Sequence, residues 1–125
     1  MTPEDQQFSG RRPTLTNSEW NAKLVLDEVL KHGNYAVFPG FKLSSVIYAP
    51  PRGFSHQSPE WNYATRAHFD FVICNAETHM PEFAIELDDP THWNNPETQR
   101  RDRMKNALCE AADFELLRIE SSALS

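Results

Sequence analysis

Alternation of apolar and polar residues in the middle of the chain predicts two buried β-strands. Residues 67–74 and 83–88 are mostly apolar, and the polar residues between them are typical of a hairpin turn. Each apolar run contains carboxylate residues, which are rarely buried without a partner. We therefore expect the two strands to pair and to bring acidic side chains together.

A period of two sorts the side chains of these strands onto opposite faces. In the first strand, one face is expected to hold His68, Asp70 and Val72, and the other Phe69, Phe71 and Ile73. In the second strand, Glu86 and Asp88 share a face, whereas Ile85 and Leu87 point into the core.

Helical periodicity follows a capping signal near the start of the chain. Thr16 and Glu19 fit the capping box, in which a Ser/Thr cap and a Glu three residues later satisfy each other's backbone amides. The spacing i, i+3, i+4, i+7 predicts a buried face made of Ala22, Val25, Leu26 and Val29. Gly33 is expected to end this helix in a left-handed conformation.

The rest of the chain completes a mixed α/β order of elements. In chain order, we expect a strand at 35–38, an extended stretch at 41–49, a loop at 50–66, a helix at 97–112 and a strand at 115–120. We expect one domain over residues 14–125, preceded by a flexible polar tail of residues 1–13.

Composition narrows the possible classes of protein. A net charge of −6 argues against a strongly basic, non-specific nucleic-acid binder. No apolar stretch is long enough to span a membrane, and the N-terminus lacks a signal pattern. Cys74 and Cys109 have no zinc-site spacing and are expected to be small core residues. Two unpaired thiols fit a cytoplasmic location.

Three acids on the central strands form the main candidate site. If the strands pair, Asp70, Glu86 and Asp88 can converge, and burying them together is costly without a cation. Oxygen ligands suit Mg²⁺ or Mn²⁺, which would activate water for phosphodiester hydrolysis. The alternative is that these acids lie at strand ends in contact with water.

Three further residues have both a functional and a structural interpretation. Lys105 could stabilise the transition state from the second helix, or it could be a solvated lysine paired with Asp102. His92 could bind a phosphate oxygen or act as a general acid, or it could be an ordinary loop histidine. Glu19 could be an outer metal ligand in addition to, or instead of, its capping role.

Basic residues gather in two places that could contact a nucleic acid. The first is the start of the second helix, which holds Arg100, Arg101 and Arg103, although such a run is often only a solvated helix face. The second is the loop with Arg52 and Arg66, where Trp61 and Tyr63 could stack on bases or simply anchor the loop.

The order of these motifs resembles the PD-(D/E)XK nuclease superfamily. The similarity is carried by Asp70, by the Glu86-Leu87-Asp88 strand, by His92, by Arg101-Asp102-x-x-Lys105 and by the 116–119 strand. It is closest to small prokaryotic domains related to very-short-patch-repair endonucleases, and it covers roughly residues 16–120.

This resemblance implies a restriction-endonuclease-like fold, with a mixed central sheet flanked by helices. It also implies that Asp70 and Glu86 ligate a divalent metal and that Glu19 matches the first-helix glutamate of many members. The chain departs from the superfamily at Asp88, where a lysine usually stands. Catalysis then needs another positive charge, from Lys105 or from a second metal on Asp88.

Two functions follow as hypotheses. The first is a metal-dependent nuclease acting on DNA, with RNA not excluded, alone, as a homodimer, or within a defence, repair or mobile-element complex. The second is a catalytically inactive module with the nuclease fold, for nucleic-acid binding or complex assembly.

Overall fold

The computed structural model describes residues 14–89 and 94–124. The longer elements are helix α2 (Asn17–Leu30), strand β1 (Tyr35–Pro39), strand β2 (Phe71–Asn75), strand β3 (Pro81–Asp88), helix α5 (Pro96–Ala111) and strand β4 (Glu115–Glu120). The short ones are α3 (Leu43–Val46), α4 (Pro59–Ala64) and the 3-10 helix η2 (Ser121–Leu124). The predicted tail, residues 1–13, lies outside the described residues.

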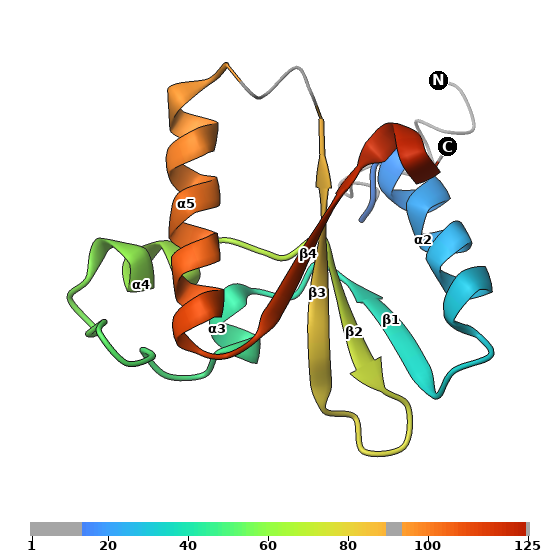
Figure 1. Cartoon of the computed structure of the whole chain (residues 1–125), viewed down its shortest axis with the longest axis horizontal. Coiled ribbons are helices and arrows are strands. Elements are labelled where there is room, and N and C mark those ends of the chain that lie inside the picture. The colour runs from blue at the N-terminus through green and yellow to red at the C-terminus, as the bar shows by residue number, and fades with distance from the viewer. Residues whose placement is uncertain (1–13, 90–93, 125) are drawn as a thin grey trace, which may run out of the picture.

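Four strands form one mixed sheet in the order β1-β2-β3-β4. The pairs β1–β2 and β2–β3 are antiparallel, whereas β3 and β4 are parallel and are connected through α5. Helix α2 covers one side of the sheet, and α3, α4 and α5 lie on the other (Figure 1). The predicted α/β class, with a mixed sheet flanked by helices, is confirmed.

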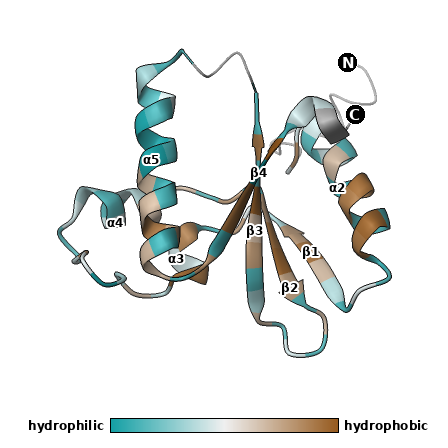
Figure 2. Cartoon of the chain, in the orientation of Figure 1, coloured by the Kyte–Doolittle hydropathy of each residue, from teal (hydrophilic) through white to brown (hydrophobic). Residues whose placement is uncertain are grey.

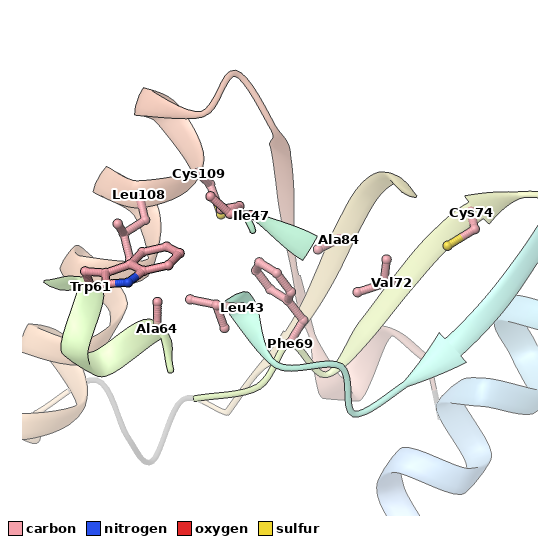
Figure 3. Close-up of a cluster of buried hydrophobic side chains, with 10 residues drawn as sticks. All are labelled: Leu43, Ile47, Trp61, Ala64, Phe69, Val72, Cys74, Ala84, Leu108 and Cys109. Carbon is pink, nitrogen blue, oxygen red and sulfur yellow. The ribbon is translucent and has the colours of Figure 1, made fainter. Parts of the chain in front are cut away.

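Each face of the sheet has its own apolar core. On the α2 side, Ala22 and Leu26 pack against Phe71, Ile73 and Ile85. On the other side, residues of α3, α4 and α5 meet the sheet around Phe69 (Figure 3). The central strands are apolar along most of their length, and the first half of α5 is hydrophilic (Figure 2). The residues of β2 from Phe71 to Cys74 are therefore buried on both faces.

Helix α2 begins as its sequence predicts. The capping box is present, with Thr16 Oγ1 accepting from the Glu19 amide at 3.1 Å and Glu19 Oε1 accepting from the Thr16 amide at 2.9 Å. Two details of the prediction are wrong. Val29 is 67% exposed, because the face of α2 that packs on the sheet follows Ala22, Leu26 and Leu30. Gly33 does not adopt a positive φ, since the helix ends at Lys31 in right-handed geometry.

The first central strand begins four residues later than predicted, at Phe71. Residues 67–69 instead bond to the segment after β1: the Leu43 amide donates to the Ala67 carbonyl at 3.0 Å, and the Phe69 amide donates to the Phe41 carbonyl at 2.8 Å. This change of partner breaks the alternation before β2. Phe69 therefore packs on the α5 side with Val72, and not on the side of Phe71.

Two short helices occupy stretches predicted to be extended or irregular. Helix α3 lies within 41–49 and buries Leu43, whereas α4 lies within the predicted loop and buries Trp61 and Ala64. Ser58 and Pro59 at the start of α4 are a recognisable helix-start signal, since proline suits the first helical turn. Tertiary burial of apolar side chains stabilises both helices, which are too short to be stable alone.

The second half of the chain follows the prediction closely. Helix α5 begins after Asn95, whose side chain accepts from the Glu97 and Thr98 amides. Its buried residues are Lys105, Leu108 and Cys109. Cys74 and Cys109 are free and buried, as expected. Over residues 14–89 and 94–124, none of the helices combines the length and apolar character that crossing a membrane requires.

Candidate functional site

Asp70 and Glu86 meet where the ladder between β2 and β3 ends. The last paired residues there are Phe71 and Ile85, so Asp70 lies opposite Glu86. Glu86 Oε2 accepts from the Asp70 amide at 2.6 Å, and Asp70 Oδ2 accepts from the Leu87 amide at 2.8 Å. Each carboxylate thus accepts a hydrogen bond from a backbone amide of the opposite segment. These two bonds lie where the backbone hydrogen bonds between β2 and β3 would otherwise continue.

Lys105 reaches this pair of acids from α5. Its ammonium donates to Glu86 Oε1 and to the His68 carbonyl, the latter at 3.0 Å, and it lies 5.8 Å from the centre of the Phe69 ring. Lys105 and Glu86 are both only 6% exposed, so the ion pair is buried. The expectation of a solvated lysine paired with Asp102 is wrong: the fold brings Lys105 to the acids.

The environment makes ionisation of Asp70 unfavourable. Burial and the negative charge of Glu86 raise the pKa of Asp70 to about 6, against the lowering effects of the Leu87 amide and the Lys105 charge. One ammonium group therefore does not fully neutralise two neighbouring carboxylates. A site with this excess of negative charge would gain from a further cation.

Asp88 pairs with a cation other than Lys105. Arg118 of β4 donates from Nη1 to Asp88 Oδ1 at 3.1 Å and lies 3.5 Å from Asp102 Oδ1. Arg118 also donates to the Asn106 side chain at 2.8 Å. The expected convergence of three acids is thus corrected to a pair, Asp70 and Glu86, with Asp88 in a separate network.

Glu19 and His92 complete the set of residues expected around the metal. The capping role of Glu19 is present, and its negative charge adds slightly to the rise in the pKa of Asp70. His92 lies outside the described residues.

A divalent metal such as Mg²⁺ prefers oxygen ligands, which Asp70 and Glu86 supply. Within the described part of the chain, no group of three or more His, Cys, Asp or Glu side chains is arranged to hold an ion. Asp70 and Glu86 nevertheless offer hard oxygen atoms close together, and Mg²⁺ commonly binds through one or two carboxylates and keeps several waters. The pair supplies the number of carboxylates through which such an ion commonly binds.

A family profile described as a protein of unknown function, DUF2726, matches residues 11–125. The chain belongs to the DUF2726 family. No curated protein and no solved structure matches it. The matched range contains every element of the sheet together with Asp70, Glu86 and Lys105, so the DUF2726 domain and the described fold coincide.

The DUF2726 fold gathers some of the predicted nucleic-acid-binding residues into one cleft. This cleft has a volume of about 430 Å³ and lies between α4 and α5, where Arg66, Arg100 and Arg101 line it. Arg103 lines a neighbouring hollow with Glu60, and Arg52 lies in another beside Ala111. The five arginines are therefore not one surface.

Sequence reasoning missed the role of Arg118 in this DUF2726 domain. It shares a strand face with Leu116, which packs against the core on the α5 side. A charged residue in register with a core residue was an available signal that a partner must exist. The partners themselves, Asp88 and Asp102, could be identified only once β4 was known to pair with β3 in parallel.

Proposed function

We propose that this DUF2726 domain is a divalent-metal-dependent nuclease that hydrolyses phosphodiester bonds, with DNA as its substrate. The observation that supports this most directly is the buried contact of Lys105 with Glu86, beside Asp70. It places two carboxylates and one ammonium together, which is the chemistry that the resemblance to PD-(D/E)XK nucleases requires. The lysine comes from α5 because Asp88 stands at the usual lysine position.

Each residue has a definite role in this proposal. Asp70 and Glu86 would hold Mg²⁺ or Mn²⁺, which lowers the pKa of a bound water and offsets charge on the phosphate. Lys105 fixes the position of Glu86. Among the described residues, two of its three N–H groups have acceptors, Glu86 and the His68 carbonyl. The third can donate to the attacking water or to a phosphate oxygen.

A non-catalytic module with the same fold is the second candidate, and one observation favours it. Protein groups already satisfy both Glu86 oxygens, through the Asp70 amide and Lys105, and also Asp70 Oδ2, through the Leu87 amide. Such a network can stabilise the junction of β2 and β3 without a metal.

Incubation with nucleic acid separates the two candidates. The purified chain would be mixed with supercoiled plasmid, circular single-stranded DNA and RNA, with Mn²⁺ or with EDTA. We expect Mn²⁺-dependent nicking that falls to background in Asp70→Asn and Glu86→Gln. Glu110→Gln, a change at an exposed position of α5, is the matched control and should cleave like the unmodified chain.

Circular dichroism would establish that each variant is folded before its activity is compared. Cleavage that persists in folded Glu86→Gln, or that proceeds in EDTA, would contradict the proposed site. Absence of cleavage on all three substrates, with Mn²⁺ present, would favour the non-catalytic module.

A further inference from the structure

The cleft between α4 and α5 is positively charged in a chain that is acidic overall. Three guanidinium groups line it, from Arg66, Arg100 and Arg101, with a single carboxylate, Glu97. The chain as a whole has a net charge of −6. A local excess of positive charge on an acidic protein indicates an anionic ligand rather than general attraction to polyanions.

The arginines in the cleft remain available to a ligand. Glu97 Oε1 lies 3.4 Å from Arg101 Nε and 3.7 Å from Arg100 Nη1, so one exposed carboxylate is shared between two cations. Exposed ion pairs of this kind contribute little free energy and are readily exchanged. Arg66 makes no ion pair within the described residues, and its Nε donates to the Asn62 carbonyl at 3.3 Å. That bond leaves the other guanidinium nitrogens of Arg66 free for a phosphate.

The cleft adjoins the acidic pair through two of its lining residues. His68 lines the cleft, and its carbonyl accepts from the Lys105 ammonium at 3.0 Å. Tyr63 also lines the cleft, where burial raises the pKa of its hydroxyl and the charges of Lys105 and Glu86 act on it in opposite directions. The cleft is therefore connected to Glu86 through His68 and Lys105.

The lining favours an unpaired strand over a duplex. The exposed ring of His68 and the half-buried ring of Tyr63, which also packs against the core, line the cleft, and stacking on them requires a base that is not enclosed in a double helix. A volume of about 430 Å³ is near the lower end of the range for small-ligand sites and suits one nucleotide rather than paired strands.

We propose that the cleft between α4 and α5 binds a nucleotide of a single-stranded DNA segment, with Arg66 and Arg101 on its phosphates and Tyr63 against its base. This inference rests on the proposed function for its substrate class, DNA. It adds a preference for single strands over duplexes. It assigns the arginines of the cleft a role in binding and none in bond cleavage.

Fluorescence anisotropy in EDTA measures this binding without any cleavage. The probes are a fluorescein-labelled oligothymidylate of about 12 nucleotides and a blunt duplex of the same length. We expect the single strand to bind at least tenfold more tightly than the duplex. Arg66→Gln and Arg101→Gln should each weaken binding about five- to tenfold and lower the salt dependence by about one counterion.

Two further variants make the test specific. Tyr63→Leu, confirmed as folded by circular dichroism, should weaken single-strand binding by fivefold or more, since stacking on one base is lost. Lys31→Gln removes an exposed positive charge from the end of α2, on the other side of the sheet (Figure 1), and should leave affinity unchanged. The inference is overturned if Arg66→Gln, Arg101→Gln and Tyr63→Leu all bind the single strand as tightly as the unmodified chain does. It is also overturned if the duplex binds as tightly as the single strand.

Failure of this inference and failure of the proposed function give different results. Mn²⁺-dependent cleavage that is unaffected by changes in the cleft contradicts the binding cleft and leaves the nuclease intact. Cleft-dependent binding of single strands without any cleavage supports the cleft and contradicts the nuclease.

Discussion

The ammonium of Lys105 on α5 donates to the Glu86 carboxylate on β3 inside the protein, where each residue is only 6% exposed. The two residues are 19 positions apart, and the crossover from β3 through α5 to β4 brings them together. Asp88 stands where the resemblance to PD-(D/E)XK nucleases would lead us to expect a lysine. The helix thus provides, from a different element, a positive charge next to the acids.

Removing only one partner of the buried pair should be strongly destabilising. Lys105→Met leaves Glu86 buried without its cation, and we expect the free energy of unfolding to fall by about 3 kcal/mol. Adding Glu86→Leu removes the unpaired charge, so the double variant should recover most of that loss. Urea unfolding of both single variants and the double variant measures the coupling. A Lys105→Met variant as stable as the unmodified chain would show that the pair does not persist in solution.

Asp70 should make stability depend on pH in the opposite direction to an ordinary paired acid. Its pKa is raised from 3.8 to about 6 by burial and by Glu86, so the folded state holds a proton that the unfolded state releases. The contribution of this residue is therefore favourable below pH 4 and is lost as the pH rises toward 6.

Asp70→Asn should remove the free-energy cost of ionising a buried Asp70 at neutral pH, while it keeps an oxygen for the Leu87 amide. In EDTA at pH 7.5, about 2 kcal/mol of extra stability is expected, and the advantage should disappear near pH 4. Thermal unfolding across this pH range is the measurement. A variant that is less stable than the unmodified chain at neutral pH would contradict the unfavourable environment of Asp70.

The two roles of Glu19 can be separated by two substitutions. Glu19→Gln keeps an oxygen for the Thr16 amide, so stability should change by less than about 0.5 kcal/mol, whereas Glu19→Ala should lose about 1 kcal/mol. A metal ion, in contrast, would be attracted by the negative charge of Glu19, which Glu19→Gln removes. If Glu19 is an outer ligand, Glu19→Gln should reduce the rise in melting temperature that Mn²⁺ produces. An unchanged Mn²⁺ response would assign Glu19 to the cap alone.

Both cysteines should react slowly with thiol reagents in the native state. Burial raises the pKa of Cys74, and it raises the pKa of Cys109 to about 11, so little thiolate is present at pH 8. We expect the aromatic disulfide reagent DTNB to label neither residue until the chain is unfolded in urea, when two thiols should react. Rapid labelling of the native protein would indicate that the core opens easily.

Sequence reasoning succeeded where a local signal and tertiary packing agree. The capping box located α2, alternation located β3, and the helix expected at 97–112 matches α5. Asp70 and Glu86 were expected to meet, together with Asp88, because acids in apolar strands need partners.

The errors arose where a distant contact decides the local structure. Residues 67–69 have the composition of a strand, but their hydrogen bonds to Phe41 and Leu43 turn Phe69 to the other face. Asp88 was grouped with Glu86 by strand periodicity, yet its ion pair is with Arg118 of the neighbouring strand. Periodicity within a segment contains no information on which residue of another segment lies beside it.

The exchange of side-chain and backbone bonds between Asp70 and Glu86 also provides two natural reporters. The Asp70 amide proton points to Glu86 Oε2, and the Leu87 amide proton points to Asp70 Oδ2. Their NMR frequencies should therefore register any event that changes the charge or position of either carboxylate. The junction of β2 and β3 can be monitored through these two signals in the unlabelled polypeptide backbone, without introducing a probe into the site.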